Sequence, residues 1–435
     1  MSRLLKYFLV LTLLVSISSS QQKLVLNLEQ AINIAKKNSP ELSIANLDYT
    51  KSLKKVSEVY SDNLFPTLTL NSRYIRNFKK QTINIFGQNF ELGSDNSINT
   101  TIDATESIPF LGVPVFSGIR IAEYYEKISA ENVKNTEAKL KADTKKAFLN
   151  SLLLKEVITV TQASLSNAEE NLRVVEARYK AGVALEFDYI RAKVKVETIK
   201  PELNRNRNNL EISNKLLKNT IGLPVNQEIE LTGELSYDSL EVWEPMNNLI
   251  SRVSEKNVAV RQLKLSKLIN DELIEVDYAN YLPKFYVFAQ YGLSTSENDG
   301  RGISKYRFFN SLTGGIGLSW NLNFFSTGYK EQQSKIESKK TDKQIRNVKE
   351  RLKTQTESIF LRIEDAKNRI KAQREIVMQA ERGYELANIS FLSGVINQID
   401  VIDSQLLLTQ AKLGYLQAIY DYLIAKVELE QLLEK

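Results

Sequence analysis

A short motif occurs twice in this chain and constrains the fold more than any other feature. In each copy an aromatic residue precedes a glycine by three positions, a valine follows the glycine directly, and an aspartate comes six positions after it. The copies span residues 179–188 and 391–400, with Gly182 and Gly394 at their centres. Each interrupts a long apolar run with helical spacing, so each is predicted to be a tip turn between two helices. Glycine can adopt the positive φ that ends a helix, and the aspartate can accept backbone N–H groups where the next helix begins.

The motif belongs to a larger internal duplication. Residues 1–20 combine a basic start, a short apolar stretch and small residues at the end, which is typical of a secretory signal peptide. We predict a first repeat over residues 21–227, a linker over 228–246 and a second repeat over 247–435. Each repeat has the order short helix, two strands, long helix, tip turn and helix.

Helical periodicity predicts a long helix before each turn and a shorter helix after it. The long helices are predicted to follow Gly118 and Gly328 and to reach the turns, and the second has a heptad pattern that ends at Phe391. The shorter helices are predicted over residues 188–220 and 400–433.

Further helices are predicted ahead of the strands. One covers residues 28–63 with a break at Ser39–Pro40, and the other covers residues 247–281. The sequence Ile221-Gly222-Leu223-Pro224 is a strong stop signal at the end of the first repeat.

Four strands are predicted from alternating apolar and polar residues. Three cover residues 65–74, 98–108 and 285–291, and long polar loops are predicted over 77–96 and 294–310. The fourth strand is predicted from apolar residues that share one face: Ile316, Leu318, Trp320, Leu322 and Phe324.

The composition argues against an enzyme. The chain has no cysteine and no histidine, so it lacks thiolate ligands and the side chain that most often serves as general base or metal ligand. No phosphate-binding glycine loop or nucleophile motif is present. We therefore expect no catalytic residues, no cofactor and no metal site. The net charge of +6, with 58 basic and 52 acidic residues, does not indicate nucleic acid as a partner.

Alternating strands in a secreted chain indicate an outer-membrane barrel. Four strands cannot close a barrel, and an open strand edge is not tolerated in lipid. Several copies of the chain are therefore needed, and three would supply twelve strands. The two polar loops would then face the cell exterior. A periplasmic pair of β-hairpins that caps a coiled coil remains the alternative.

The tip motifs, the helix start at Leu28 to Ala35 and the Ile221–Pro224 stop together resemble the TolC-like outer-membrane efflux protein family, over essentially the whole mature chain. The resemblance implies a predominantly helical α+β membrane protein: a long periplasmic α-helical coiled-coil barrel continuous with a transmembrane β-barrel. It also implies a homotrimer in outer-membrane lipid that binds a periplasmic adaptor protein and an inner-membrane transporter. Such a protein is the exit channel of a tripartite efflux pump or a type I secretion system, localised to the outer membrane and reaching into the periplasm.

The resemblance also implies a constriction at the periplasmic tips. Asp400 and Asp403 match an aspartate ring at the entrance, and Asp188 matches an aspartate that is bonded by an aromatic residue and an arginine of the neighbouring tip. Phe391 occupies the aromatic position without a hydroxyl, and Ile396 replaces the arginine, so the polar latch is not expected here. Packing of Phe391 and Ile396 is predicted to take its place. Asp188 and Asp400 are also expected to be helix N-caps.

A second class of function stays open at this point. A structural or adaptor-type periplasmic coiled-coil protein without channel activity would share the helical pattern. An adaptor should carry compact glycine-rich β domains beside its hairpin, and the sequence shows none. The transported substrate is not indicated, because a passive duct takes its specificity from its pump.

Overall fold

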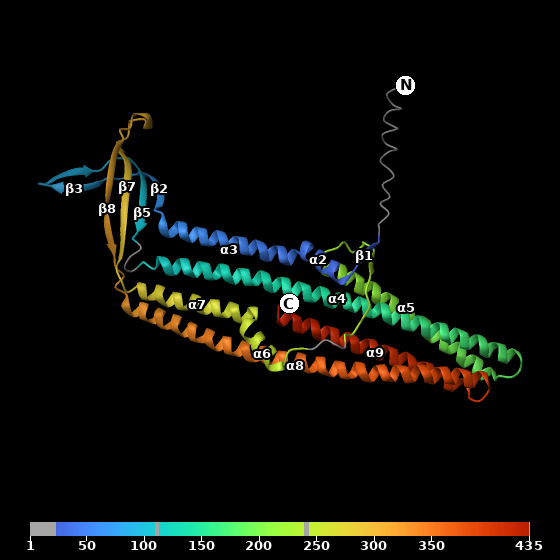
Figure 1. Cartoon of the computed structure of the whole chain (residues 1–435). Coiled ribbons are helices and arrows are strands. Elements are labelled where there is room, and N and C mark those ends of the chain that lie inside the picture. The colour runs from blue at the N-terminus through green and yellow to red at the C-terminus, as the bar shows by residue number, and fades with distance from the viewer. Residues whose placement is uncertain (1–22, 109–112, 239–242, 435) are drawn as a thin grey trace, which may run out of the picture. The chain divides into compact units, whose positions relative to one another are not determined.

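The computed structural model describes residues 23–108, 113–238 and 243–434 (Figure 1). The predicted signal peptide lies outside the described residues. Among the helices that the structure describes, none combines the length and the apolar character needed to cross a membrane.

The chain divides into two compact units, each built from both halves of the sequence. The sheet unit takes its residues from segments 45–132 and 258–348. The tip unit takes its residues from the segment that ends at Ile44, from 133–257, and from Lys349 onward.

The sheet unit contains a four-stranded antiparallel sheet in the order β2-β5-β7-β8. Its strands are β2 (Thr67–Arg76), β5 (Asn96–Ser107), β7 (Lys284–Glu297) and β8 (Phe309–Ser319). The four predicted strands are therefore present, and the two repeats meet where β5 pairs with β7. Within the described part of the chain, β2 and β8 each leave one edge unpaired.

The sheet has one apolar face and one polar face. Its register aligns an exposed apolar row across all four strands: Leu70, Ile102, Tyr291 and Leu312. The opposite face is polar around Asp103, whose carboxylate accepts hydrogen bonds from three side chains: Asn71, Thr101 and Gln290. This division is what a strand between lipid and water requires.

The prediction for the fourth strand is wrong at its end. Strand β8 stops at Ser319, so Trp320 and Leu322 lie beyond it, and Phe324 begins helix α8 (Phe324–Leu392). The indole N–H of Trp320 donates to the carbonyl of Tyr281 (3.1 Å), and its ring lies 6.1 Å from that of Phe324. The apolar alternation thus continues across a strand-to-helix junction, where ring packing replaces strand pairing.

The predicted loop over residues 77–96 contains a β-hairpin that the sequence analysis missed. Strands β3 (Gln81–Ile85) and β4 (Gln88–Leu92) pair antiparallel and turn at Phe86 and Gly87, which both have positive φ (53° and 82°). Hairpin turns of this kind are usually recognised by Asn-Gly or Asp-Gly, so phenylalanine at the first position conceals the signal. The second loop contains a short 3₁₀ helix, η1 (Ile303–Lys305).

Helices α4 and α7 in the sheet unit are joined by two ion pairs of opposite polarity. The helices of this unit are α7 (Val258–Ala279), the part of α3 (Pro40–Leu64) from Ala45 onward, and the first parts of α4 (Val115–Lys180) and α8. Arg120 of α4 binds both carboxylate oxygens of Glu272 in α7, through Nε (2.6 Å) and Nη2 (2.7 Å). In return, Arg261 of α7 donates its Nε to Glu131 of α4 (2.8 Å).

The tip unit contains the helices on both sides of each turn. Its elements are the remainders of α4 and α8 together with α2 (Leu28–Asn38), α5 (Glu186–Thr220), α6 (Met246–Lys256), α9 (Gln398–Leu432) and a parallel pair of short strands, β1 (Leu24–Leu26) and β6 (Ile229–Leu231). The break at Ser39–Pro40 is confirmed. The single helix predicted over 247–281 is wrong: Asn257 is extended (φ −63°, ψ 139°) and separates α6 from α7. Its side-chain amide donates to the carbonyl of Leu432 (3.3 Å), which holds the break in place.

One hydrophobic core in the tip unit joins segments that are far apart in the sequence. Fully buried members of this core are Leu26, Phe148, Leu217, Ile359, Ile363, Tyr422 and Leu429. The stop after α5 packs against it, because Ile221 is also fully buried there. Gly222 follows with φ +71°, and a Cβ at this position would lie 2.8 Å from Cβ of Asn38.

Candidate functional site at the helical tips

The two tip turns have the same backbone geometry. Gly182 and Gly394 have φ of +73° and +77°. At the first turn the N–H of Val183 donates to the carbonyl of Arg178 (2.9 Å), and at the second the N–H of Val395 donates to that of Ser390 (2.9 Å). These are the six-to-one bonds of a Schellman motif, which satisfies carbonyls that a helix end leaves free. Both glycines therefore lie in turns that end a helix.

The helices that follow the turns begin differently from the prediction. The N-cap of α9 is Asn397, and Asp400 is the third helical residue, whose side chain accepts the N–H of Asn397 (3.1 Å) in a capping box. The N-cap of α5 is Leu185, which makes no capping bond, and Asp188 is again the third helical residue. Neither aspartate is therefore an N-cap, although Asp400 does support the start of its helix.

Asp400 and Asp403 present two carboxylates on the second tip. Both are exposed, and they lie three positions apart on α9, so they share one side of the helix. Asp188, on the first tip, is partly buried. Within the described residues no group of three or more acidic, histidine or cysteine side chains is arranged to hold a metal ion. The described residues of the site therefore place two exposed carboxylates on the surface of the tip, and they form no nucleophile or acid–base pair that would indicate catalysis.

Phe391 joins the two tips through apolar packing. Its side chain is only 8% exposed and lies in a cluster with Val175 of α4, Ala192 of α5 and Val401 of α9. Ile396 is partly buried against the same cluster. All four helices therefore contribute to one small core directly behind the turns.

Arg178 is a tip residue that the sequence analysis missed. It lies in the last turn of α4, and its guanidinium donates to two carbonyls at the end of α8: Nη1 to Phe391 (3.1 Å) and Nη2 to Leu392 (2.8 Å). The same group lies over the ring of Phe391, 4.6 Å from its centroid. The sequence signal was an asymmetry directly before the two motif copies, because Ser390 precedes the second copy where Arg178 precedes the first.

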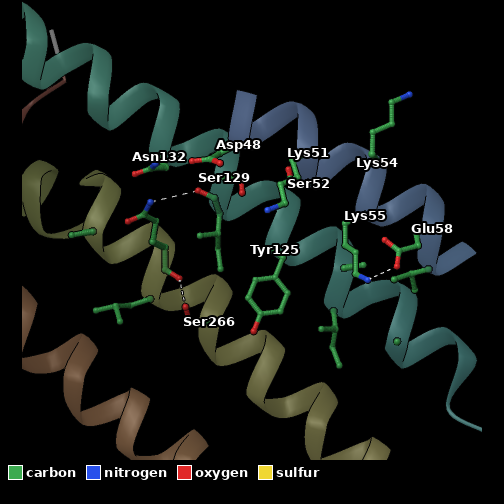
Figure 2. A pocket seen from close by; sticks show the side chains of 18 residues that line it. Asp48, Lys51, Ser52, Lys54, Lys55, Glu58, Tyr125, Ser129, Asn132 and Ser266 are labelled. Atoms are coloured by element: carbon green, nitrogen blue, oxygen red, sulfur yellow. Dashed lines mark hydrogen bonds and ion pairs between the residues drawn. The ribbon is translucent and has the colours of Figure 1, made fainter. Parts of the chain in front are cut away.

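The sheet unit contains a separate cavity of about 1050 Å³ between α3, α4 and α7. Figure 2 shows Tyr125 projecting from α4 between the helices, Lys55 turned toward Glu58 on α3, and Lys54 directed away from the cavity. Lys55 and Glu58 form an ion pair (2.7 Å). Apolar side chains and a mixed rim of lysines and acids line this space, and it contains none of the predicted entrance residues.

Comparison with known proteins agrees with this architecture. The sequence matches the family described as outer membrane efflux protein over residues 31–223 and 249–434. The outer membrane protein TolC of Escherichia coli (strain K12) is 24% identical over 417 residues, which cover 94% of this chain and 82% of that protein.

Solved structures of outer-membrane channels have the same fold. The channel OprN superposes with a TM-score of 0.76 at 15% identity, over 94% of this chain and 89% of that chain. VceC from Vibrio cholerae superposes with a TM-score of 0.76 at 12% identity, over 94% of this chain and 96% of that chain.

The fold is that of outer-membrane channels, which are transport proteins and not enzymes. This chain belongs to the outer membrane efflux protein family. It is accordingly an outer-membrane protein that extends into the periplasm, and its predominantly helical α+β class is confirmed. Channels of this class are homotrimers that work with adaptor proteins and inner-membrane transporters.

Proposed function

We propose that three copies of this chain form the outer-membrane exit channel of a tripartite efflux pump or a type I secretion system. The observation that carries the proposal is the four-stranded sheet, which has two unpaired edges and an exposed apolar face within the described chain. In lipid, unpaired backbone groups at a strand edge can be satisfied only by closure with further strands. Three copies would supply twelve strands and would close the sheet.

The tips are proposed to form the periplasmic entrance, with Asp400 and Asp403 at its narrowest point. Three copies would bring six exposed carboxylates toward one axis. Such a ring attracts cations and repels itself, so it favours a movement of the tip helices that separates the charges. Asp188 is proposed to face the neighbouring hairpin.

The outer surface of the tips is proposed to bind a periplasmic adaptor. Large apolar side chains at the turns are exposed in the single chain: Val183, Leu185, Phe187 and Val395. Apolar side chains grouped at one end of a secreted protein indicate a contact surface for a partner. The adaptor would connect the entrance to an inner-membrane transporter, which would select the substrate.

Conductance in planar lipid bilayers tests the channel and its entrance. The double variant Asp400→Ala/Asp403→Ala should raise single-channel conductance several-fold or weaken block by a trivalent cation, because the ring charge is removed. A matched control, Glu364→Ala/Glu375→Ala, removes two exposed acids of α8 that lie outside the tip turn and should leave both quantities unchanged.

Two outcomes would count against the proposal in different ways. Unchanged current and unchanged block in the double variant would rule out the proposed carboxylate ring without contradicting the channel itself. Absence of conductance in the parent and in every variant, with the protein found only in the soluble fraction, would instead favour a structural coiled-coil protein.

A further inference from the structure

We propose that Arg178 is a clamp that holds the two tips of each chain together and thereby positions the entrance in its closed form. This inference rests on the proposed channel function. It assigns the latch to an arginine on the first hairpin, where the resemblance to the family placed an arginine on the second.

The end of α8 lacks a cation of its own. Its last turn contains no basic residue, whereas the last turn of α4 contains Arg178 and Lys180. A helix C-terminus carries partial negative charge on its free carbonyls and is stabilised by a nearby cation. Arg178 supplies that cation from the other hairpin, because its two nitrogens reach the carbonyls of Phe391 (3.1 Å) and Leu392 (2.8 Å).

Three different contacts coincide at this one side chain. The guanidinium makes two charge-assisted hydrogen bonds, lies 4.6 Å from the ring centroid of Phe391, and borders the apolar cluster that buries this ring. The planar fork of arginine is suited to two parallel acceptors, and lysine cannot reproduce it. Any movement of the α8–α9 tip away from the α4–α5 tip must break these contacts together.

The same tip contains a matched arginine that makes no such connection. Arg191 lies over the ring of Phe187 with a guanidinium-to-centroid distance of 4.5 Å, and both residues belong to α5. This pair resembles the Arg178–Phe391 pair in chemistry and differs in joining residues of a single helix. Arg191→Ala therefore removes a cation and a ring contact without separating the hairpins.

Conductance measurements on Arg178→Ala, Arg178→Lys and Arg191→Ala separate a clamp from a general loss of charge. Arg178→Ala should shift the open-to-closed ratio about tenfold toward open, equivalent to about 1.4 kcal/mol. Arg178→Lys should give an intermediate shift, since one ammonium retains the charge without the fork. Arg191→Ala should behave as the parent.

A distance measurement gives a second readout that does not need ion flow. The chain has no native cysteine, so spin labels at Ala181→Cys and Ser393→Cys report the separation of the exposed tips specifically. The distance distribution should be narrow in the parent and in Arg191→Ala, and broader in Arg178→Ala. Identical distributions in the parent and in Arg178→Ala, or equal effects of Arg178→Ala and Arg191→Ala, would overturn the clamp. If no protein conducts but the distances change as expected, the channel proposal fails together with the role of Arg178 at an entrance, and only the connection that Arg178 makes between the two tips is supported.

Discussion

Within the described residues, three glycines with positive φ end helices, and their surroundings differ. Gly182, Gly222 and Gly394 all have φ between +71° and +77°. A Cβ at Gly182 or Gly394 would meet no atom within 4 Å, whereas a Cβ at Gly222 would lie 2.8 Å from Cβ and 3.0 Å from the carbonyl oxygen of Asn38. The tip glycines are therefore required only for their backbone conformation, and Gly222 is required also for its lack of a side chain.

This difference predicts unequal effects of the same substitution. Gly182→Ala should lower the free energy of unfolding by about 1–2 kcal/mol, which is the cost of placing a side chain in the left-handed region. Gly222→Ala should have the same backbone cost and should lower the free energy of unfolding by about 1–3 kcal/mol more, because the new side chain overpacks against Asn38. Thermal unfolding followed by circular dichroism measures both. Equal melting temperatures for the two variants would show that the approach to Asn38 relaxes without cost.

The ion pairs between helices α4 and α7 determine which turn of one helix lies against which turn of the other. Arg120 holds Glu272 through two hydrogen bonds and thereby lowers the pKa of that carboxyl group, with a smaller contribution from Ser117. A carboxyl group whose pKa is lower in the folded state stabilises the fold above its ordinary pKa. That stabilisation is lost as the pH falls through the lowered value.

The Glu272 pair predicts a specific dependence of stability on acid. The melting temperature of the parent should fall as the pH drops below the ordinary range for a glutamate, and Glu272→Gln should reduce this fall while lowering stability at neutral pH. The neutral-pH loss should be about 1.5–3 kcal/mol, typical of hydrogen bonds to a charged group. Glu170 serves as the control, because its partner Arg173 lies on the same helix and also lowers its pKa.

Melting temperatures measured across the pH range for the parent, Glu272→Gln and Glu170→Gln test this prediction. Glu170→Gln should change the melting temperature only slightly at any pH, since its pair is exposed and joins no second element. Parallel pH profiles for the parent and Glu272→Gln would show that the pair does not contribute to the acid response.

Local sequence patterns predict the elements well and their partners poorly. Periodicity and glycine placement located the long helices, the two tip turns and the four strands, because these depend on residues close together in the chain. The break at Asn257 depends on the carbonyl of Leu432, and the end of β8 depends on the packing of Trp320 on a helix. Contacts between distant segments are not encoded in local spacing, so these features could not be predicted.

The candidate site shows the same division. The positions of Gly182, Gly394 and the exposed Asp400 follow from the motif itself, whereas Asp403 lies beyond the motif and was assigned from the resemblance to the family. Arg178 was not predicted, because its acceptors are backbone carbonyls of a different hairpin and leave no signature in side-chain sequence. The N-cap assignments were wrong because each aspartate is the third residue of its helix, and only Asp400 forms a capping box there.

For the whole molecule, the open edges of the sheet predict that a single chain is not the functional form. Native mass spectrometry of the protein extracted from membranes should give the mass of three chains, and the complex should dissociate on heating. The reason is that β2 and β8 can satisfy their free backbone groups only on neighbouring copies. A stable monomer in detergent, or a complex of two or four chains, would contradict the twelve-stranded closure.

The core of the tip unit joins residues that are far apart in the sequence, and this affects the order in which the unit can fold. Leu26 and Leu429 are buried in the same cluster, and the first strand of the chain pairs with β6, which follows α5. Contacts between such distant residues form late, since long intervening segments must be ordered first. The amino-terminal segment therefore has no finished surface to join until the carboxyl-terminal helix has been exported. We therefore expect this unit to become stable only after all the segments that share its core have reached the periplasm, and its apolar segments to be prone to aggregation until then.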